Sequence, residues 1–396
     1  AAVPWPRGLE FVDGELVVLA RGRHRRAGGV DPSIADRSGA LFVLDPEVAE
    51  PVVPGQLAGP EVAANARLIA APTAPPFLVY DPQAGPPESD TLMDRPYCTL
   101  AWDAASENFF ICGYSGVDLP GGVFRKNATD SIHRFDRRDG AWHTVELHDA
   151  AVVPKEELTR VVPNGYYPHH DPTRNAAPHG LLNGPDGATV VGRYLYAVGK
   201  DNHTLAQYDL TEIRARPDAG APEGRAVLGE RVDVRFGDQL RELQFLGHSA
   251  LAARDGWLYV GYRTSSAVVR FPLDSDGDLV RPVVGELIAV FQPWDPELGK
   301  SANLMDLAFD PSGDLYVACA RGGRVWRVGR PDPERVFDGI DGEHPWVDLV
   351  ELTGNPRAGV GNITFDAAGR LLFCSGNYDT DSRMAGVIYR ATANPQ

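Results

Sequence analysis

The feature that most constrains the fold of this chain is a motif that recurs along its whole length. Each copy has a small or polar residue, an apolar run, a turn containing Asp or Gly, and a second apolar run. Such a unit indicates a β-hairpin, because Asp and Gly adopt the backbone angles of tight turns. Repetition of the unit is typical of folds that pack copies side by side. The copies begin at Arg7, Cys98, His179, His248, Met305 and Gly361.

Most copies continue in a third apolar stretch of strand length. Six units of at least three strands each predict an all-β fold, a six-bladed β-propeller that forms a single domain over residues 1–396. A seventh, partial blade around Leu68–Asp81 is the alternative. Long insertions at 47–95, 116–128 and 152–178 then belong to the first three blades. The third stretches are Ala40–Asp45, Ser131–Asp136, Leu205–Asp209, Ala267–Phe271, Arg324–Val328 and Gly386–Arg390.

Composition narrows the range of partners. The formal net charge of −16 predicts a surface that repels phosphate backbones and anionic lipids, so we expect neither nucleic acid nor membrane as a partner. No apolar run reaches the roughly 18 residues needed to span a bilayer, which predicts a soluble protein. The sequence leaves open whether it is cytoplasmic or exported. The four cysteines form no CxxC pair, which excludes zinc ribbons and thioredoxin-type motifs.

The stretch Asp310–Val325 resembles the senescence marker protein and gluconolactonase superfamily, with its NHL-repeat relatives. Gly386–Arg390 is similar to the closing strand of that superfamily. The resemblance implies a six-bladed propeller that binds a divalent metal at its central pore. The implied ligands are a Glu, two Asn and an Asp, each at or just before the start of an innermost strand.

The chain departs from this implied ligand pattern at three positions. Arg7 stands where the Glu is expected, and His179 stands where an Asn is expected. The Asp position falls on Met305, with Asp306 one residue later. These departures argue against a calcium site made only of oxygen ligands.

Histidines supply the remaining metal signal. Five of the ten histidines lie between residues 169 and 248, and His179 and His248 are expected at equivalent positions on adjacent blades. Because imidazole suits zinc, iron or copper, we predict one such divalent ion with His179, His248, Asp306 and Asn362 as ligands. Two alternatives stay open, namely a metal-free polar pocket that uses the two histidines and a purely structural role.

The leading functional hypothesis is a metal-assisted hydrolase that acts on a small ester, lactone or sugar-derived molecule at the central pore. The metal would polarise a carbonyl and lower the pKa of a bound water. One alternative is an iron- or copper-dependent oxidase, oxygenase or lyase. Another is a propeller that binds a ligand or protein without catalysis. The predicted catalytic residues are Asp306, His179 and Arg7, and the predicted substrate contacts are His169, His170, Tyr167 and Asn362.

Arg7 and Asp306 also have simpler interpretations. Arg7 can hold Asp306 in an ion pair or bind a substrate carboxylate. Asp306 can cap its strand by accepting backbone N–H groups. The segment Asp274–Asp278 is similar to the opening of a calcium-binding loop, but no Glu follows at the twelfth position, so we predict a plain hairpin turn there.

Overall fold

The protein is nearly all β in the part of the chain that the structure describes. The only helices there are two of five residues each, α3 (Thr211–Ala215) and α4 (Leu349–Thr353). None of the helices found there is long and apolar enough to cross a membrane. The computed structural model describes residues 6–20, 40–47, 67–70, 99–113, 116–119, 123–126, 131–147, 153–154, 181–182, 184–200, 202–291, 301–339, 345–354, 358–375 and 388–391.

The first three large sheets each have four antiparallel strands, and the order of the strands from the centre outward follows the chain. The first contains β1 (Pro6–Val12), β2 (Glu15–Ala20), β3 (Leu41–Leu44) and β4 (Arg67–Ala70). The second contains β5 (Thr99–Asp103), β6 (Asn108–Gly113), β9 (Ser131–Asp136) and β10 (Trp142–Leu147). The third contains β12 (Pro185–Val191), β13 (Tyr194–Gly199), β14 (Thr204–Asp209) and β15 (Gly224–Leu228).

Three further large sheets come from the second half of the chain. The fourth contains β18 (His248–Arg254), β19 (Trp257–Tyr262), β20 (Ala267–Pro272) and β21 (Gly285–Phe291), and it is extended by the hairpin β16 (Arg231–Phe236) and β17 (Gln239–Gln244) and by β25 (Phe337–Gly339). The fifth contains β22 (Leu304–Phe309), β23 (Leu315–Cys319), β24 (Arg324–Gly329) and β26 (Val347–Asp348). The sixth contains β27 (Val360–Phe365), β28 (Leu371–Ser375) and β29 (Ile388–Ala391).

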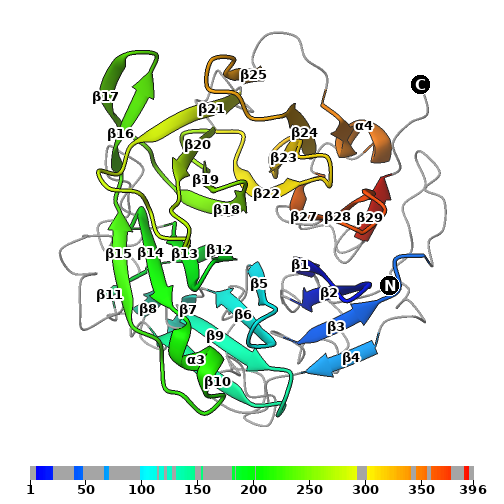
Figure 1. Cartoon of the computed structure of the whole chain (residues 1–396). Helices are drawn as coiled ribbons and strands as arrows, with labels where there is room; N and C mark the ends of the chain where they lie inside the picture. Colours follow the sequence, from blue (N-terminus) through cyan, green and yellow to red (C-terminus); the bar gives the residue numbers. More distant parts are fainter. Residues whose placement is uncertain are drawn as a thin grey trace.

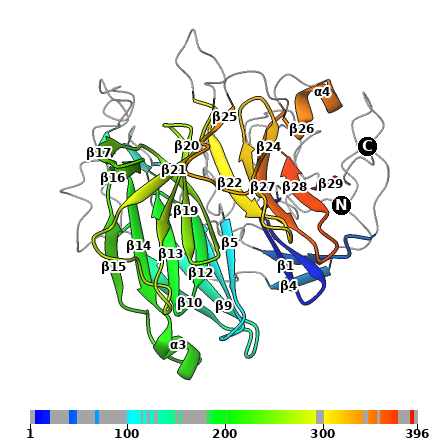
Figure 2. The ribbon, with the colours of Figure 1, turned by 45° about the horizontal axis from the view of Figure 1, so that its top comes forward.

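These six sheets follow one another around a common centre (Figure 1, Figure 2). The innermost strands are β1, β5, β12, β18, β22 and β27; each lies beside the next, and β27 lies beside β1. The predicted β-propeller is therefore confirmed. A smaller sheet of β7 (Gly116–Leu119), β8 (Val123–Lys126) and β11 (Val153–Pro154) joins parts of two predicted insertions.

An apolar cluster lies between each pair of neighbouring sheets. The second strand of each sheet contributes to the clusters on both of its faces, which explains why these strands are continuous apolar runs rather than alternating ones. Each fully buried side chain of this size contributes about 1.5–3 kcal/mol to folding. Representative pairs are Leu19 with Phe109, Phe110 with Leu195, Tyr196 with Val260, Tyr259 with Val317, Tyr316 with Phe373, and Leu372 with Val18.

One detail of the strand prediction is wrong. The third hairpin was expected to begin at His179, but its inner strand is β12, which begins at Pro185. A tight turn at Gly192, with φ of +55°, connects β12 to β13, so the run directly before that turn is the strand. Residues 68–70, at the start of the alternative seventh blade (Leu68–Asp81), belong to β4, which pairs with β3 of the first sheet, and residues 71–81 lie outside the described residues.

The Asp-containing turns share one hydrogen-bonding pattern, which explains why the motif recurs. The Oδ1 atoms of Asp274, Asp310 and Asp366 each accept a hydrogen bond of 2.9 Å from the backbone N–H four residues later. Each turn therefore closes with its own carboxylate. The predicted hairpin turn at Asp274–Asp278 is confirmed.

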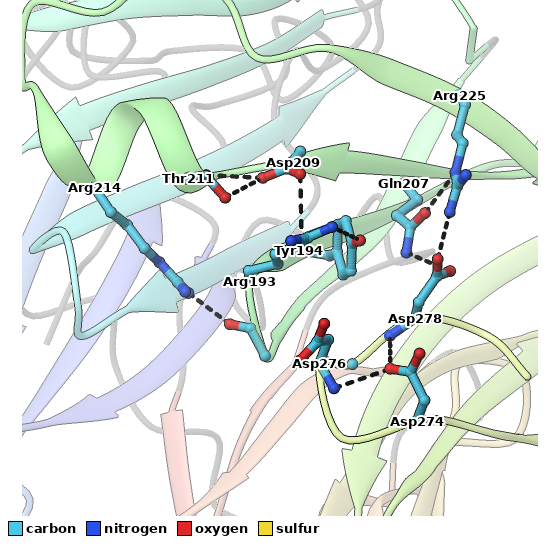
Figure 3. A network of polar contacts seen from close by, with 12 residues as sticks. Arg193, Tyr194, Gln207, Asp209, Thr211, Arg214, Arg225, Asp274, Asp276 and Asp278 are labelled. Atoms are coloured by element: carbon cyan, nitrogen blue, oxygen red, sulfur yellow. Dashed lines mark hydrogen bonds and ion pairs between the residues drawn. The ribbon is translucent and has the colours of Figure 1, made fainter.

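The same turn also connects the third sheet to the fourth (Figure 3). Asp278 accepts hydrogen bonds from Arg225 at 2.6 Å and from Gln207 at 3.1 Å, and both donors lie on the third sheet. Gly192 lies so close to this turn that a Cβ there would be 2.0 Å from the carbonyl oxygen of Asp276. Polar contacts and close backbone packing together hold these two sheets in place.

Candidate functional site

The two ends of the ring carry different parts of the chain. All six inner strands begin at one end, which we call the His248 end, and turn into the second strands at the other, which we call the Asp278 end. Several long connections leave the His248 end and return to it. Function in such folds concentrates on loops. The described residues that flank them include Ala20 and Ala40, Ala70 and Thr99, Gly113 and Ser131, and Leu147 and Pro185.

Asp306 lies near the start of β22, and its carboxylate reaches the next inner strand. It accepts hydrogen bonds of 2.9 Å from its neighbour Leu307 and from the backbone N–H of Ile363 in β27. The Asn362 side chain donates a further hydrogen bond to it. The structure therefore brings together the predicted site residues Asp306 and Asn362.

Arg7 joins the same group from β1. Its side chain is buried, and its charge lowers the pKa of Asp306. Gly361 leaves room for it, because a Cβ there would lie 3.4 Å from Nη1 of Arg7 and 2.8 Å from the Cys374 sulfur. We call Arg7, Asp306 and Asn362 the Asp306 cluster; it combines residues from three sheets.

Glu10 is a member of this neighbourhood that the sequence analysis missed. Its pKa is raised to about 8, mainly by burial and also by the charge of Asp306, while a hydrogen bond from the Trp102 backbone acts in the opposite direction. Burial also raises the pKa of Asp306 to about 7, against its hydrogen bonds and the charge of Arg7. The two partly exposed carboxyls therefore interact electrostatically, and the pKa values of both lie near neutral pH.

His248 belongs to a second group, between the third and fourth sheets. Its ring is fully buried, and neither ring nitrogen has a hydrogen-bond partner. It lies 4.7 Å from the ring of Tyr262 and 6.4 Å from that of His203, measured between centroids. The pKa of His248 is lowered to about 3, mainly by burial and also by electrostatic interaction with His203, so the ring is neutral at neutral pH. The buried hydroxyl of Tyr262 also has no partner.

The described members of the predicted metal-ligand set have different neighbours. His248 lies with His203 and Tyr262, whereas Asp306 and Asn362 lie with Arg7. Across the described ranges, no group of three or more His, Cys, Asp or Glu side chains is placed to hold a metal ion. The other predicted site residues, His179, His169, His170 and Tyr167, lie outside the described residues.

The tautomer of His203 also argues against metal binding in the His248 group. Its Nδ1 atom accepts a hydrogen bond of 2.9 Å from the backbone N–H of Gly247. In a neutral imidazole whose Nδ1 is an acceptor, the proton is on Nε2. His203 therefore presents an N–H donor, and a lone pair for a metal is absent from Nε2.

Asn303 is another residue that the sequence analysis missed. It directly precedes β22 and has a left-handed φ of +65°, and its buried carboxamide has no hydrogen-bond partner. Gly184 and Gly247 hold the equivalent positions before β12 and β18, with φ of +67° and +70°. An Asn where other blades have Gly was the available signal, because both residues tolerate this conformation.

No protein-family model matches the chain, and no curated protein matches its sequence. Several solved structures are similar at low identity. A streptogramin B lyase is 11% identical, with 93% of this chain and 90% of that chain covered and a TM-score of 0.42. Regucalcin, a calcium-binding protein of Agrobacterium tumefaciens, is 11% identical, with 98% and 90% covered and a TM-score of 0.44. YCF48 bound to D1 peptide is 11% identical, with 99% and 93% covered and a TM-score of 0.40.

Proposed function

We propose that this protein is a hydrolase that acts on a small ester, lactone or sugar-derived substrate at the centre of the propeller. In this proposal the six sheets are the complete set of blades, and the reaction takes place at the Asp306 cluster. The observation that carries the proposal is the convergence of Arg7, Asp306 and Asn362 from three sheets near the starts of their inner strands.

The chemistry follows from the charges of the cluster. Ionised Asp306 takes a proton from water while the water oxygen attacks the substrate carbonyl carbon. The guanidinium of Arg7 stabilises the negative charge that develops on the carbonyl oxygen. Protonated Glu10, whose pKa is about 8, gives its proton to the departing alkoxide. The products are a carboxylic acid and an alcohol. The proton taken up by Asp306 is released to water and Glu10 takes a proton from water, so both carboxyls return to their starting states.

The predicted zinc, iron or copper ion is a separate proposal that depends on His179. Such an ion would polarise the substrate carbonyl, but no step above uses it. Metal analysis of the purified protein tests this part. A stoichiometric transition metal that is lost in His179→Ala supports it. Absence of metal, together with unfolding that chelators do not change, contradicts it.

The hydrolase proposal is tested with a panel of aryl esters and lactones. We expect turnover by the wild-type protein and a loss of about 10²-fold or more in kcat/KM for Asp306→Asn, the range of a removed general base. Asp278→Asn is the control, because its carboxylate also accepts hydrogen bonds, from Gln207 and Arg225, but lies at the other end of the ring. Circular dichroism verifies that both variants fold. Equal activity in wild type and Asp306→Asn contradicts the proposal.

A specific observation also favours a second candidate, a propeller that binds a ligand without catalysis. The carboxyls of Asp306 and Glu10 each accept a backbone N–H from a neighbouring inner strand, from Ile363 and Trp102 respectively. Such bonds connect adjacent sheets and are useful without any reaction. A protein that hydrolyses no member of the panel but is destabilised by Asp306→Asn fits this second candidate.

A further inference from the structure

The Asp306 cluster is built on strands whose pairing is irregular near their starts. The register between each inner strand and its second strand shifts at Arg7–Gly8 in β1, at Met305 in β22 and at Gly361–Asn362 in β27. Bulges of this kind re-aim side chains and are frequent beside functional sites. Arg7 and Asn362 therefore leave the regular ladder, and their positions depend on the groups that hold the bulges.

One residue of β28, Cys374, stands opposite the Gly361–Asn362 bulge. Its side chain is fully buried in the apolar cluster between the sixth and first sheets. The backbone N–H of Asn362 donates a hydrogen bond to the Cys374 sulfur at 3.2 Å. A bulge takes an amide out of the strand ladder, and a buried amide needs a partner. The sulfur therefore supplies the acceptor that the bulge removes.

The same sulfur also contacts the first sheet, across the junction at which β27 and β1 close the ring. The S–H group of Cys374 donates to the backbone carbonyl of Arg7 at 3.8 Å, a weak hydrogen bond. The pKa of Cys374 is raised to about 11, mainly by burial, so this proton is present at neutral pH. The charges of Arg7 and Asp306 act on the same thiol in opposite directions, which places it within electrostatic range of both.

Gly361 packs directly against the thiol. A Cβ at this position would lie 2.8 Å from the Cys374 sulfur and 3.4 Å from Nη1 of Arg7. The sulfur, the Gly361 backbone and the guanidinium are thus close neighbours in a packed interior, where a shift of one group moves the others.

Two simpler roles fit these contacts less well. A nucleophilic cysteine must be ionised and accessible, whereas Cys374 is buried and protonated. A cysteine that only fills apolar space needs no polar contacts, whereas the Cys374 sulfur accepts from one cluster residue and donates to another.

We infer that Cys374 is a positioning residue of the Asp306 cluster, whose thiol holds Asn362 and Arg7 in place across the junction between the sixth and first sheets. It acts through the backbones of these two residues. Its effect on catalysis rests on the proposed hydrolase, because a misplacement of about 1 Å can cost up to about 10²-fold in rate. The two contacts themselves are independent of any reaction.

The contacts are tested by amide hydrogen exchange of the full-length protein, followed by NMR. In Cys374→Ala, we expect the backbone N–H of Asn362 to exchange at least about tenfold faster than in wild type, because its acceptor is gone. Cys374→Ser keeps a donor and an acceptor and should keep this exchange slow. An unchanged exchange rate in Cys374→Ala overturns the inference.

Cys319→Ala is the matched control. Cys319 is also a buried cysteine of a second strand, in the neighbouring fifth sheet, and no hydrogen bond of its sulfur is found within the described ranges. The Cys319→Ala variant should leave the exchange of the Asn362 amide within about twofold of wild type. Equally fast exchange in both alanine variants would reflect general loss of stability and would overturn the inference.

The catalytic effect is tested on a substrate that the wild-type protein hydrolyses. We expect Cys374→Ala to lower kcat about tenfold with KM unchanged, since the displaced groups act in the transition state. Cys374→Ser should stay within about threefold of wild type. Equal loss of kcat in Cys374→Ala and Cys319→Ala contradicts the positioning role. If wild type hydrolyses no substrate, the hydrolase proposal fails, and hydrogen exchange alone decides whether Cys374 holds the cluster.

Discussion

Two tyrosines at opposite ends of the ring show how differently the ends use their polar groups. Tyr196 in the third sheet and Tyr262 in the fourth are both fully buried residues of second strands. The Tyr196 hydroxyl donates to the Gly277 carbonyl at 2.7 Å and accepts from Gln207 at 2.6 Å. The Tyr262 hydroxyl has no partner.

The same contrast extends beyond the tyrosines. At the Asp278 end, the carboxylates of the turns bond to backbone amides and arginines, so their hydrogen-bonding capacity serves the fold. At the His248 end, buried groups of His248, Tyr262 and Asn303 are unsatisfied. Each such group costs about 1–3 kcal/mol. The lesson is that the turn carboxylates of the Asp278 end bond to the rest of the fold, whereas His248, Tyr262 and Asn303 at the His248 end have no such partner.

The largest expected effect is at a buried ion pair of the Asp278 end. Asp103, at the end of β5, accepts two hydrogen bonds from Arg214, at 3.0 and 2.9 Å, and one from Ser106 at 2.6 Å. We expect Asp103→Ala to lower the free energy of unfolding by about 2–4 kcal/mol, since it leaves a partly buried guanidinium unpaired. Urea denaturation measures this, with the exposed Asp238→Ala as control. If Asp103→Ala lowers the free energy of unfolding by less than about 0.5 kcal/mol, the ion pair does not stabilise the fold and the structural role proposed for the Asp278 end is contradicted.

Two glycines, one packed and one not, test whether close backbone packing also stabilises the Asp278 end. Gly192 and Gly237 both have φ of +55°, but only Gly192 has a close neighbour, the Asp276 carbonyl at 2.0 Å from a built Cβ. Replacement by alanine strains both positions alike. We expect Gly192→Ala to cost about 1–3 kcal/mol more than Gly237→Ala in thermal or urea unfolding, because the turn must move. Equal costs would show that the turn does not hold the third and fourth sheets together.

The pH dependence of stability distinguishes the carboxylates of the two regions. The pKa of Asp306 is raised, mainly by burial, to about 7, so the folded state keeps a proton that the unfolded state loses near pH 4. Wild type therefore loses stability as pH rises from about 4 to 7. Asp306→Asn lacks this loss, and we expect its stability relative to wild type to improve by on the order of 1 kcal/mol between pH 5 and pH 8.

Asp278 supplies the control for the pH experiment. Burial alone would raise the pKa of Asp278, but hydrogen bonds from Gln207 and Arg225 outweigh it and lower the pKa. The carboxyl is therefore ionised at both pH values in folded and unfolded chains. The stability difference between wild type and Asp278→Asn should thus be the same at pH 5 and pH 8. If the stability difference between wild type and Asp306→Asn is also the same at pH 5 and pH 8, the pKa of Asp306 is not raised.

Much of the fold was predictable because each blade repeats a local signal. The turn Asp and Gly residues and the apolar runs predicted five of the six inner hairpins and all six third strands, such as β9 at Ser131–Asp136. The third inner strand was missed because Leu181–Leu182 extends an apolar run that starts at His179, while β12 contains Pro185, Asp186 and Gly187. At this point of the chain the most apolar segment is not the segment that pairs as the inner strand.

The site was less predictable, because it depends on which residues of different strands face each other. Asp306 and Asn362 were expected near the centre and lie together, but His248 turns toward the gap between two sheets and contacts Tyr262. Glu10 lies within an inner strand, and nothing in its local sequence says that it faces Asp306. One residue of register decides such contacts.

The most direct test of the difference between the two ends is the free energy of unfolding of Tyr196→Phe and Tyr262→Phe, measured side by side. Tyr196→Phe should lose about 1–2 kcal/mol, because it leaves the Gly277 carbonyl and the Gln207 amide short of a partner. Tyr262→Phe should lose nothing or gain slightly, because the deleted hydroxyl bonds to no group of the protein. A loss at Tyr262 as large as that at Tyr196 would contradict the account.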